Sequence, residues 1–180
     1  MFNFQFHNPT KILFGKDVIS RIAAEIPPQS RILITYGGGS IKQNGVLDQV
    51  LAALQGFKVE QFGGIEPNPS FETLMQGVAL ARARNINFLL AVGGGSVIDG
   101  TKFIAAASLF DGDPWSILEQ WGAPIKGALP FGAVLTLAAT GSEMNSGSVI
   151  SHREWKIKRP FSSPHVFPRF AALDPCTTFS

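Results

Sequence analysis

The stretch Phe88-Leu89-Leu90-Ala91-Val92-Gly93-Gly94-Gly95-Ser96 decides the fold of this chain. Its apolar run predicts a strand that is buried on both faces of a sheet. The glycines and the serine predict a turn into a helix, whose free N–H groups lie at the positive end of the helix dipole and bind phosphate. The same four residues recur as Gly37-Gly38-Gly39-Ser40 after the apolar run Arg31–Tyr36.

Two such loops in one sheet indicate a ligand with phosphates at more than one place, such as a dinucleotide. A short glycine motif is weak evidence by itself, so two ordinary strand-to-helix turns are the alternative. A P-loop is excluded, because it needs Gly-Lys-Ser/Thr and here Thr101 precedes Lys102. The ordinary Rossmann fingerprint is also excluded, because Ile98 stands where its third glycine is required.

The composition is that of one globular domain. The chain has 180 residues, of which 45% are hydrophobic and 16% are charged. A net charge of +2 is too small to indicate a nucleic-acid partner. No apolar stretch is long enough to cross a membrane, and residues 1–10 lack the pattern of a secretory signal. With Cys176 as the single cysteine, we expect a cytoplasmic protein.

Strands and helices alternate along the chain, which predicts an α/β fold with a parallel sheet. The apolar patterns predict strands at Lys11–Phe14, Arg31–Tyr36, Lys58–Phe62, Asn87–Val92, Leu129–Leu137, Ser148–Ser151, Trp155–Arg159 and Phe170–Leu173. They predict helices at Asp17–Glu25, Val46–Leu54, after Ser70, from Ser96 to Leu109 and after Asp113. We expect Ser70 and Ser96 to cap their helices, with Asp99 completing a capping box.

Several ordered motifs resemble the iron-containing (group III) alcohol dehydrogenases. They are Gly93-Gly94-Gly95-Ser96-Val97-Ile98-Asp99 with Lys102, Ala139-Thr140-Gly141-Ser142-Glu143 and Leu173-Asp174-Pro175. Within that family, Gly63-Gly64-Ile65-Glu66-Pro67-Asn68-Pro69 resembles the branch of NADPH-dependent aldehyde reductases and butanol dehydrogenases. The resemblance implies a Rossmann-like parallel sheet of the dehydroquinate synthase-like type, with residues 1–180 as the N-terminal dinucleotide-binding domain. It also implies hydride transfer between NADP(H) and a small alcohol or aldehyde.

The resemblance implies which residues bind the cofactor. The glycine loops would meet its phosphates, Asp99 would orient the phosphate loop or the nicotinamide end, and Lys158 matches a family lysine that contacts the cofactor. The full set is Gly37, Gly38, Gly39, Ser40, Asn68, Gly94, Gly95, Ser96, Asp99, Thr136, Thr140, Ser142 and Lys158. The other basic residues near Lys158 are expected to lie on a solvent-exposed hairpin; they are Arg153, Lys156 and Arg159.

No catalytic or metal-binding residue is expected within these 180 residues. In the family, an all-helical domain after Leu-Asp-Pro carries an Asp and three His that bind iron or zinc, and this chain ends before it. His7, His152 and His165 are too dispersed to replace that site. We therefore expect the chain alone to be inactive. The alternatives are a non-catalytic nucleotide-binding module and part of a glycerol dehydrogenase-like enzyme.

Two further expectations concern the cofactor and the partner. Gly37 stands where NAD-preferring relatives have an Asp, so the loop lacks the carboxylate that repels a 2′-phosphate, and NADP(H) is the expected cofactor. Phe2, Phe4 and Phe6 alternate with polar residues, as in a half-buried edge strand. The resemblance implies that this strand forms a homodimer contact.

Overall fold

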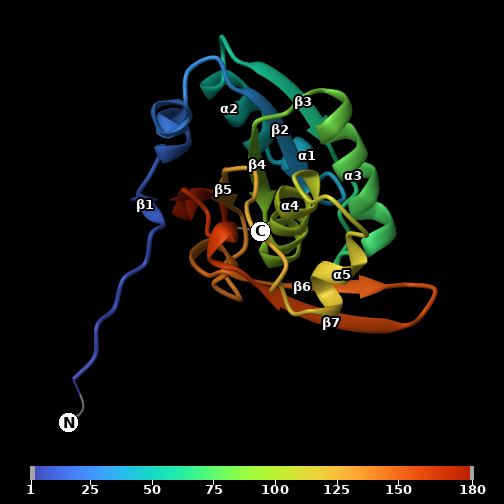
Figure 1. The fold of residues 1–180 in the computed structure, drawn as a ribbon. Helices are drawn as coiled ribbons and strands as arrows, with labels where there is room; N and C mark the ends of the chain where they lie inside the picture. Colours follow the sequence, from blue (N-terminus) through green and yellow to red (C-terminus); the bar gives the residue numbers. More distant parts are fainter. Residues whose placement is uncertain (1–2, 179–180) are drawn as a thin grey trace.

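A six-stranded parallel sheet forms the centre of the computed structural model, which describes residues 3–178 (Figure 1). The strand order is β1-β8-β5-β4-β2-β3, and every neighbouring pair is parallel. The strands are β1 (Lys11–Phe14), β2 (Arg31–Tyr36), β3 (Lys58–Phe62), β4 (Phe88–Gly93), β5 (Phe131–Leu135) and β8 (Phe170–Leu173). The α/β class and the parallel sheet confirm the sequence predictions, and β1 lies at one edge of the sheet.

Helices cover both faces of the sheet. One face packs against the 3-10 helix η1 (Val18–Glu25) and α2 (Val46–Ala53), and receives alternate side chains of the central strands, such as Leu90 and Val92 of β4. The other face packs against α3 (Phe71–Ala83) and α4 (Gly95–Ser108), and receives Leu89 and Ala91. Because β4 is buried on both faces, its sequence is continuously apolar.

The shorter elements complete the fold. They are α1 (Ser40–Gln43), α5 (Trp115–Glu119), η2 (Ser142–Met144), η3 (Pro164–Val166) and η4 (Pro175–Thr177). Strands β6 (Gly147–His152) and β7 (Ile157–Ser162) form a separate antiparallel hairpin, which lies beside α5 in Figure 1. Among residues 3–178, no helix is long and apolar enough to cross a membrane.

Hydrogen bonds between hydroxyls join the second strand to the fourth helix. The Thr35 hydroxyl on β2 lies 2.6 Å from the Thr101 hydroxyl on α4, and both residues are completely buried. The Thr101 hydroxyl also donates to the Val97 carbonyl oxygen at 2.7 Å. The contact between the two hydroxyls joins the middle of α4 to β2.

Four local predictions are corrected by the structure. Ser96 does not cap α4, because the helix already begins at Gly95 and has no side-chain cap. Asp99 therefore cannot complete a capping box, and its carboxylate instead accepts from the Val149 N–H. The helix predicted at Asp17–Glu25 is confirmed as η1, whereas residues 3–10 form no strand, although the alternation of Phe4 and Phe6 predicts one. The last hairpin strand begins at Ile157 rather than Trp155 and extends to Ser162, because it pairs with the whole of β6.

Candidate functional site

The carboxyl ends of the parallel strands gather the candidate residues at one edge of the sheet. Gly37–Ser40 follows β2, Gly93–Ser96 follows or ends β4, and Thr136–Ser142 follows β5. The segment 174–178 follows β8 at the same edge. In open α/β sheets, ligands bind at this edge, so the fold itself selects these loops.

A first cleft of about 510 Å³ lies between these loops. Five of the residues predicted to bind a cofactor line it, and these are Gly37, Gly39, Ser40, Gly94 and Thr136. Residues that the sequence analysis did not select contribute as well, including Asn44 on one side and Thr177 on the other. Thr177 lies in the motif after β8, and no functional pattern in the sequence distinguishes it.

The N-terminus of α4 has no capping side chain, and neighbouring side chains pack closely against its glycines. Its N-cap is Gly94, and no side chain accepts from its first N–H groups. A Cβ on Gly93 would lie 2.7 Å from a Val97 methyl, and a Cβ on Gly95 would lie 2.4 Å from the Thr140 hydroxyl oxygen. Glycine therefore permits close packing here, and the positive end of a 14-residue helix remains available to an anion.

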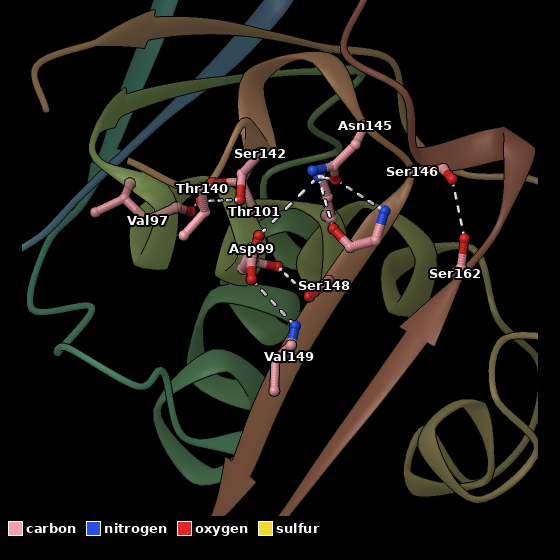
Figure 2. A network of polar contacts seen from close by, with 12 residues as sticks. Val97, Asp99, Thr101, Thr140, Ser142, Asn145, Ser146, Ser148, Val149 and Ser162 are labelled. Carbon is pink, nitrogen blue, oxygen red and sulfur yellow. Dashed lines mark hydrogen bonds and ion pairs between the residues drawn. The ribbon is translucent and has the colours of Figure 1, made fainter. Parts of the chain in front are cut away.

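A second cleft of about 600 Å³ lies on the other side of this helix end. Asp99, Thr140 and Ser142 line it together with the first residues of β6. Figure 2 shows Thr140 and Ser142 above Asp99, with their hydroxyls 2.7 Å apart. Eight of the predicted residues thus divide between two clefts, five in the first and three in the second.

The two carboxylate oxygens of Asp99 have different surroundings. Its Oδ2 accepts from the Val149 N–H at 3.1 Å (Figure 2). Its Oδ1 is buried and has no hydrogen-bond partner among the described residues, although Lys102 Nζ lies 4.0 Å from it. The ammonium group of Lys102 therefore faces this buried oxygen and offsets part of the cost of burying the carboxylate.

Burial raises the pKa of the Asp99 carboxyl above its ordinary value. The Ser142 hydroxyl, Lys102, the Val149 N–H and Lys158 act in the opposite direction without cancelling this effect. Lys158 therefore lies near enough to Asp99 for its charge to matter.

Lys102 lies beside the second cleft and is not among the cofactor-binding residues expected from the sequence. Its side chain is completely buried, and its Nζ donates to Asn145 Oδ1 at 2.8 Å and to the Gly147 carbonyl at 2.7 Å. Burial lowers the Lys102 pKa to about 8, against the attraction of Asp99 and Glu143. The signal was its place three residues after Asp99, one helical turn along α4.

The remaining candidates lie outside the two cleft linings. Lys158 on β7 donates to Asn68 Oδ1 at 2.6 Å, so these two predicted residues contact each other. Asn68 has a φ of 56°, a conformation that Asn adopts more readily than most residues. Gly38 is exposed, and Ser96 lies in the first turn of α4.

Within residues 3–178, no three side chains of His, Cys, Asp or Glu are placed to hold a metal ion. His7 and His165 are exposed. His152 is buried, with its ring stacked on Trp155 at 3.9 Å between centroids and its Nδ1 3.0 Å from Glu72.

Comparison with known proteins shows which family has these features. A family model described as "Iron-containing alcohol dehydrogenase" matches residues 9–175. "NADPH-dependent aldehyde reductase YqhD" of Escherichia coli is 58% identical over 100% of this chain and 47% of its own length. "Probable NADH-dependent butanol dehydrogenase 1" of Bacillus subtilis is 54% identical over the same shares. The chain spans about half the length of the curated relatives it matches.

Solved structures agree with this match. The crystal structure of YqhD from E. coli K-12 superposes with a TM-score of 0.95 at 59% identity, over 98% of this chain and 46% of that chain. NADH-dependent butanol dehydrogenase A from Thermotoga maritima gives a TM-score of 0.94 at 41% identity, over 99% and 46%.

Proposed function

The chain belongs to the iron-containing alcohol dehydrogenase family, and from that premise we propose that it is the cofactor-binding part of an NADP(H)-dependent enzyme. The reaction would be hydride transfer between the cofactor and a small alcohol or aldehyde. Residues 1–180 would form a single dinucleotide-binding domain. The observation that carries the proposal is the pair of clefts on either side of the open N-terminus of α4.

The two clefts suit the two ends of a dinucleotide. The pyrophosphate would lie at the start of α4, against the N–H groups of Gly94, Gly95 and Ser96, because the helix dipole favours an anion there. The adenosine end would occupy the first cleft, between Gly37–Ser40 and Thr136. The nicotinamide end would occupy the second cleft.

The second cleft has polar groups that fit a nicotinamide. The Asp99 carboxylate would orient the nicotinamide end, and the Thr140 and Ser142 hydroxyls would bond to the phosphate and ribose oxygens of the cofactor. Lys158 and Asn68, joined by their hydrogen bond, would close the far side. The cofactor supplies the hydride, and these residues bind and orient it.

Residues 3–178 contain no set of side chains that fits a metal site. We propose that iron or zinc acts only in a full-length enzyme. The expected result is no oxidation of butanol and no reduction of aldehydes by this chain with added iron or zinc. Turnover near that of a full-length relative would contradict the assignment.

NADP(H) is the preferred cofactor in our proposal, although relatives are named for either NADPH or NADH. The support is the absence of a carboxylate from Gly37–Ser40 and the presence of Lys42, whose Nζ lies 5.0 Å from the centre of the Tyr36 ring beside this loop. The four residues of α1 add little dipole, so selectivity depends on these side chains.

Cofactor titration of Gly37→Asp tests this preference. A carboxylate beside a 2′-phosphate should lower NADPH affinity by about ten- to a hundredfold and leave NADH affinity nearly unchanged. Gly37→Ala is the matched control, because any Cβ here lies 3.2 Å from the Ile65 carbonyl oxygen. Equal binding of NADH and NADPH by the original chain, or an unchanged ratio in Gly37→Asp, would contradict the proposal.

We also propose that the protein is a cytoplasmic homodimer. Residues 3–10 form no strand, and Phe4 and Phe6 are 87% and 80% exposed, so the predicted edge strand is absent from the single chain. Phe2 lies outside the described residues. A second copy would cover these rings. Sedimentation should show a dimer for the chain and a monomer after removal of residues 1–7, whereas monomers in both cases would contradict the contact.

A further inference from the structure

Asn44 precedes Gly45 in the turn between α1 and α2, and it is the one asparagine of the sequence that glycine follows. The Asn44 residue is exposed, and Gly45 has a φ of 77°, a conformation that suits glycine. A Cβ on Gly45 would meet no atom within 4 Å, so the space around this turn is open. Within residues 3–178, the Gly45 N–H has no hydrogen-bond acceptor. The peptide nitrogen after Asn44 is therefore accessible and unengaged.

The Asn44 side chain is folded back over this peptide. Its Oδ1 accepts from the Val46 N–H at 3.2 Å, two residues ahead, which is the hydrogen bond of an Asx turn. A backbone N–H can only donate, so the atom that it meets is the carbonyl oxygen of the amide. The Val46 N–H lies in the first turn of α2, at the positive end of the helix dipole. This donor stabilises negative charge that develops on Oδ1 when a nucleophile attacks the amide carbon.

We propose that Asn44 is a site of spontaneous deamidation, which converts its side-chain amide into a carboxylate. The Gly45 nitrogen gives up its proton to the solvent and attacks Asn44 Cγ, so that a carbon–nitrogen bond forms and closes a cyclic imide. The bond between Cγ and the side-chain nitrogen breaks, and that nitrogen takes up a proton and leaves as ammonia. Water then opens the imide to aspartate or isoaspartate.

The new carboxylate changes the first cleft, which Asn44 lines together with Gly39 and Ser40. This consequence rests on the proposed function, which puts the adenosine end of NADP(H), with its 2′-phosphate, in this cleft. A carboxylate on the cleft wall repels a phosphate dianion, whereas the 2′-hydroxyl of NADH carries no charge. Deamidation therefore reduces the preference of the chain for NADPH.

Asn145 is an internal control for the chemistry. It is half-buried, and Ser146 follows it, so the next peptide nitrogen carries a residue with a side chain. Its Oδ1 accepts from Lys102 Nζ at 2.8 Å and from the Gly147 N–H at 3.0 Å. We expect its amide to react more slowly than the exposed amide of Asn44.

Peptide mapping by mass spectrometry tests the chemical step. The chain is incubated at pH 7, 8 and 9, and the converted fraction of each asparagine is followed with time. Asn44 should react at least about tenfold faster than Asn145, because its attacking nitrogen is accessible and lies next to the amide. The rate should rise with pH, since the attack needs the deprotonated nitrogen. Asn44→Gln should stay unconverted over the same time, because its longer side chain must close a larger ring. Equal rates at Asn44 and Asn145 would overturn the inference.

Cofactor titration tests the consequence. Asn44→Asp carries the product carboxylate from the start, and it should bind NADPH about three- to tenfold more weakly with little change for NADH. Gln49→Glu is the matched control, because it makes the same amide-to-acid change on the exposed surface of α2, outside the lining of the first cleft. It should leave both affinities unchanged.

Incubation links the two measurements. The NADPH affinity of the original chain should fall with time toward that of Asn44→Asp, whereas the affinity of Asn44→Gln should stay constant. An NADPH affinity in Asn44→Asp equal to that of the fresh chain would overturn the assigned effect on the cofactor. If the fresh chain binds neither NADPH nor NADH, the proposed function fails, while selective conversion of Asn44 still supports the deamidation site.

Discussion

The loops Gly37–Ser40 and Gly93–Ser96 have the same four residues and different structures. The first leads into the four-residue helix α1, and Gly39 has a φ of 108°. The second leads into the 14-residue helix α4, and none of its glycines has a φ in the left-handed region. In the first loop, glycine allows the positive φ of Gly39. In the second loop, glycine leaves room for side chains that pack against the backbone.

The neighbours of each loop explain this difference. In the first loop, a Cβ on Gly38 or Gly39 would meet no atom within 4 Å, and only one on Gly37 would come close to a neighbour, the Ile65 carbonyl oxygen at 3.2 Å. In the second loop, Gly93 and Gly95 are pressed against Val97 and Thr140. Identical tetrapeptides therefore differ in tolerance to substitution, and the differences can be measured.

The largest expected difference between the two regions is in how their lysines make the free energy of unfolding depend on pH. The lysine after the second loop, Lys102, is buried, whereas the lysine after the first, Lys42, is exposed. Because the folded-state pKa of Lys102 is lowered from 10.5 to about 8, the unfolded chain binds more protons between these values. Its contribution therefore makes the free energy of unfolding rise with pH in that window, by up to about 3 kcal/mol.

Urea unfolding at pH 8, 9 and 10 measures this rise. Lys102→Met should remove the rise of the free energy of unfolding with pH that Lys102 causes. Lys42→Met should leave the dependence of that free energy on pH unchanged. The comparison fails if the two variants give the same slope.

The next effect is steric and concerns the second loop. Gly93→Ala should lower the free energy of unfolding by about 1–3 kcal/mol, because the new methyl meets the branched Val97 side chain at 2.7–2.9 Å. Gly38→Ala should change it by less than about 1 kcal/mol, with a stabilising sign, because the unfolded chain loses freedom and no atom is displaced. If Gly93→Ala and Gly38→Ala lower the thermal stability equally, the two loops do not differ in their tolerance to a side chain.

A smaller effect tests conformation in the first loop. Gly39→Ala should cost about 1 kcal/mol, since a side chain is strained at a φ of 108° even in open space. Gly39→Asn should cost less, because Asn tolerates positive φ better than Ala. An Asn variant less stable than the Ala variant would show that space, and not φ, limits this position.

The smallest effects concern the loop serines. Neither Ser40 nor Ser96 caps its helix, so changing each to Ala should alter stability by less than about 0.5 kcal/mol. Ser70 accepts from the Thr73 N–H as a true N-cap, and Ser70→Ala should cost about 1 kcal/mol. A loss of 1 kcal/mol in Ser96→Ala would contradict the helix start at Gly95.

These serines show where local patterns suffice. Ser70 precedes a helix that begins at the next residue, and the sequence rule identified it correctly. Ser96 also precedes an apolar run, but its helix already begins at Gly95, with Gly94 as the N-cap. Asp99 then turns toward β6, far along the chain, instead of toward its own helix end.

The sequence alone determined the six strands of the parallel sheet, the two glycine loops and the family, because each depends on hydrophobic periodicity or on ordered short motifs. The tertiary structure decided the division of the candidate residues between two clefts, the burial of Lys102 and the direction of the Asn145 amide. These features depend on contacts between residues distant in sequence, such as Lys102 with Asn145 and Asp99 with Val149. Local pattern contains no information on such distances, because only the packing of β6 against α4 brings these groups together.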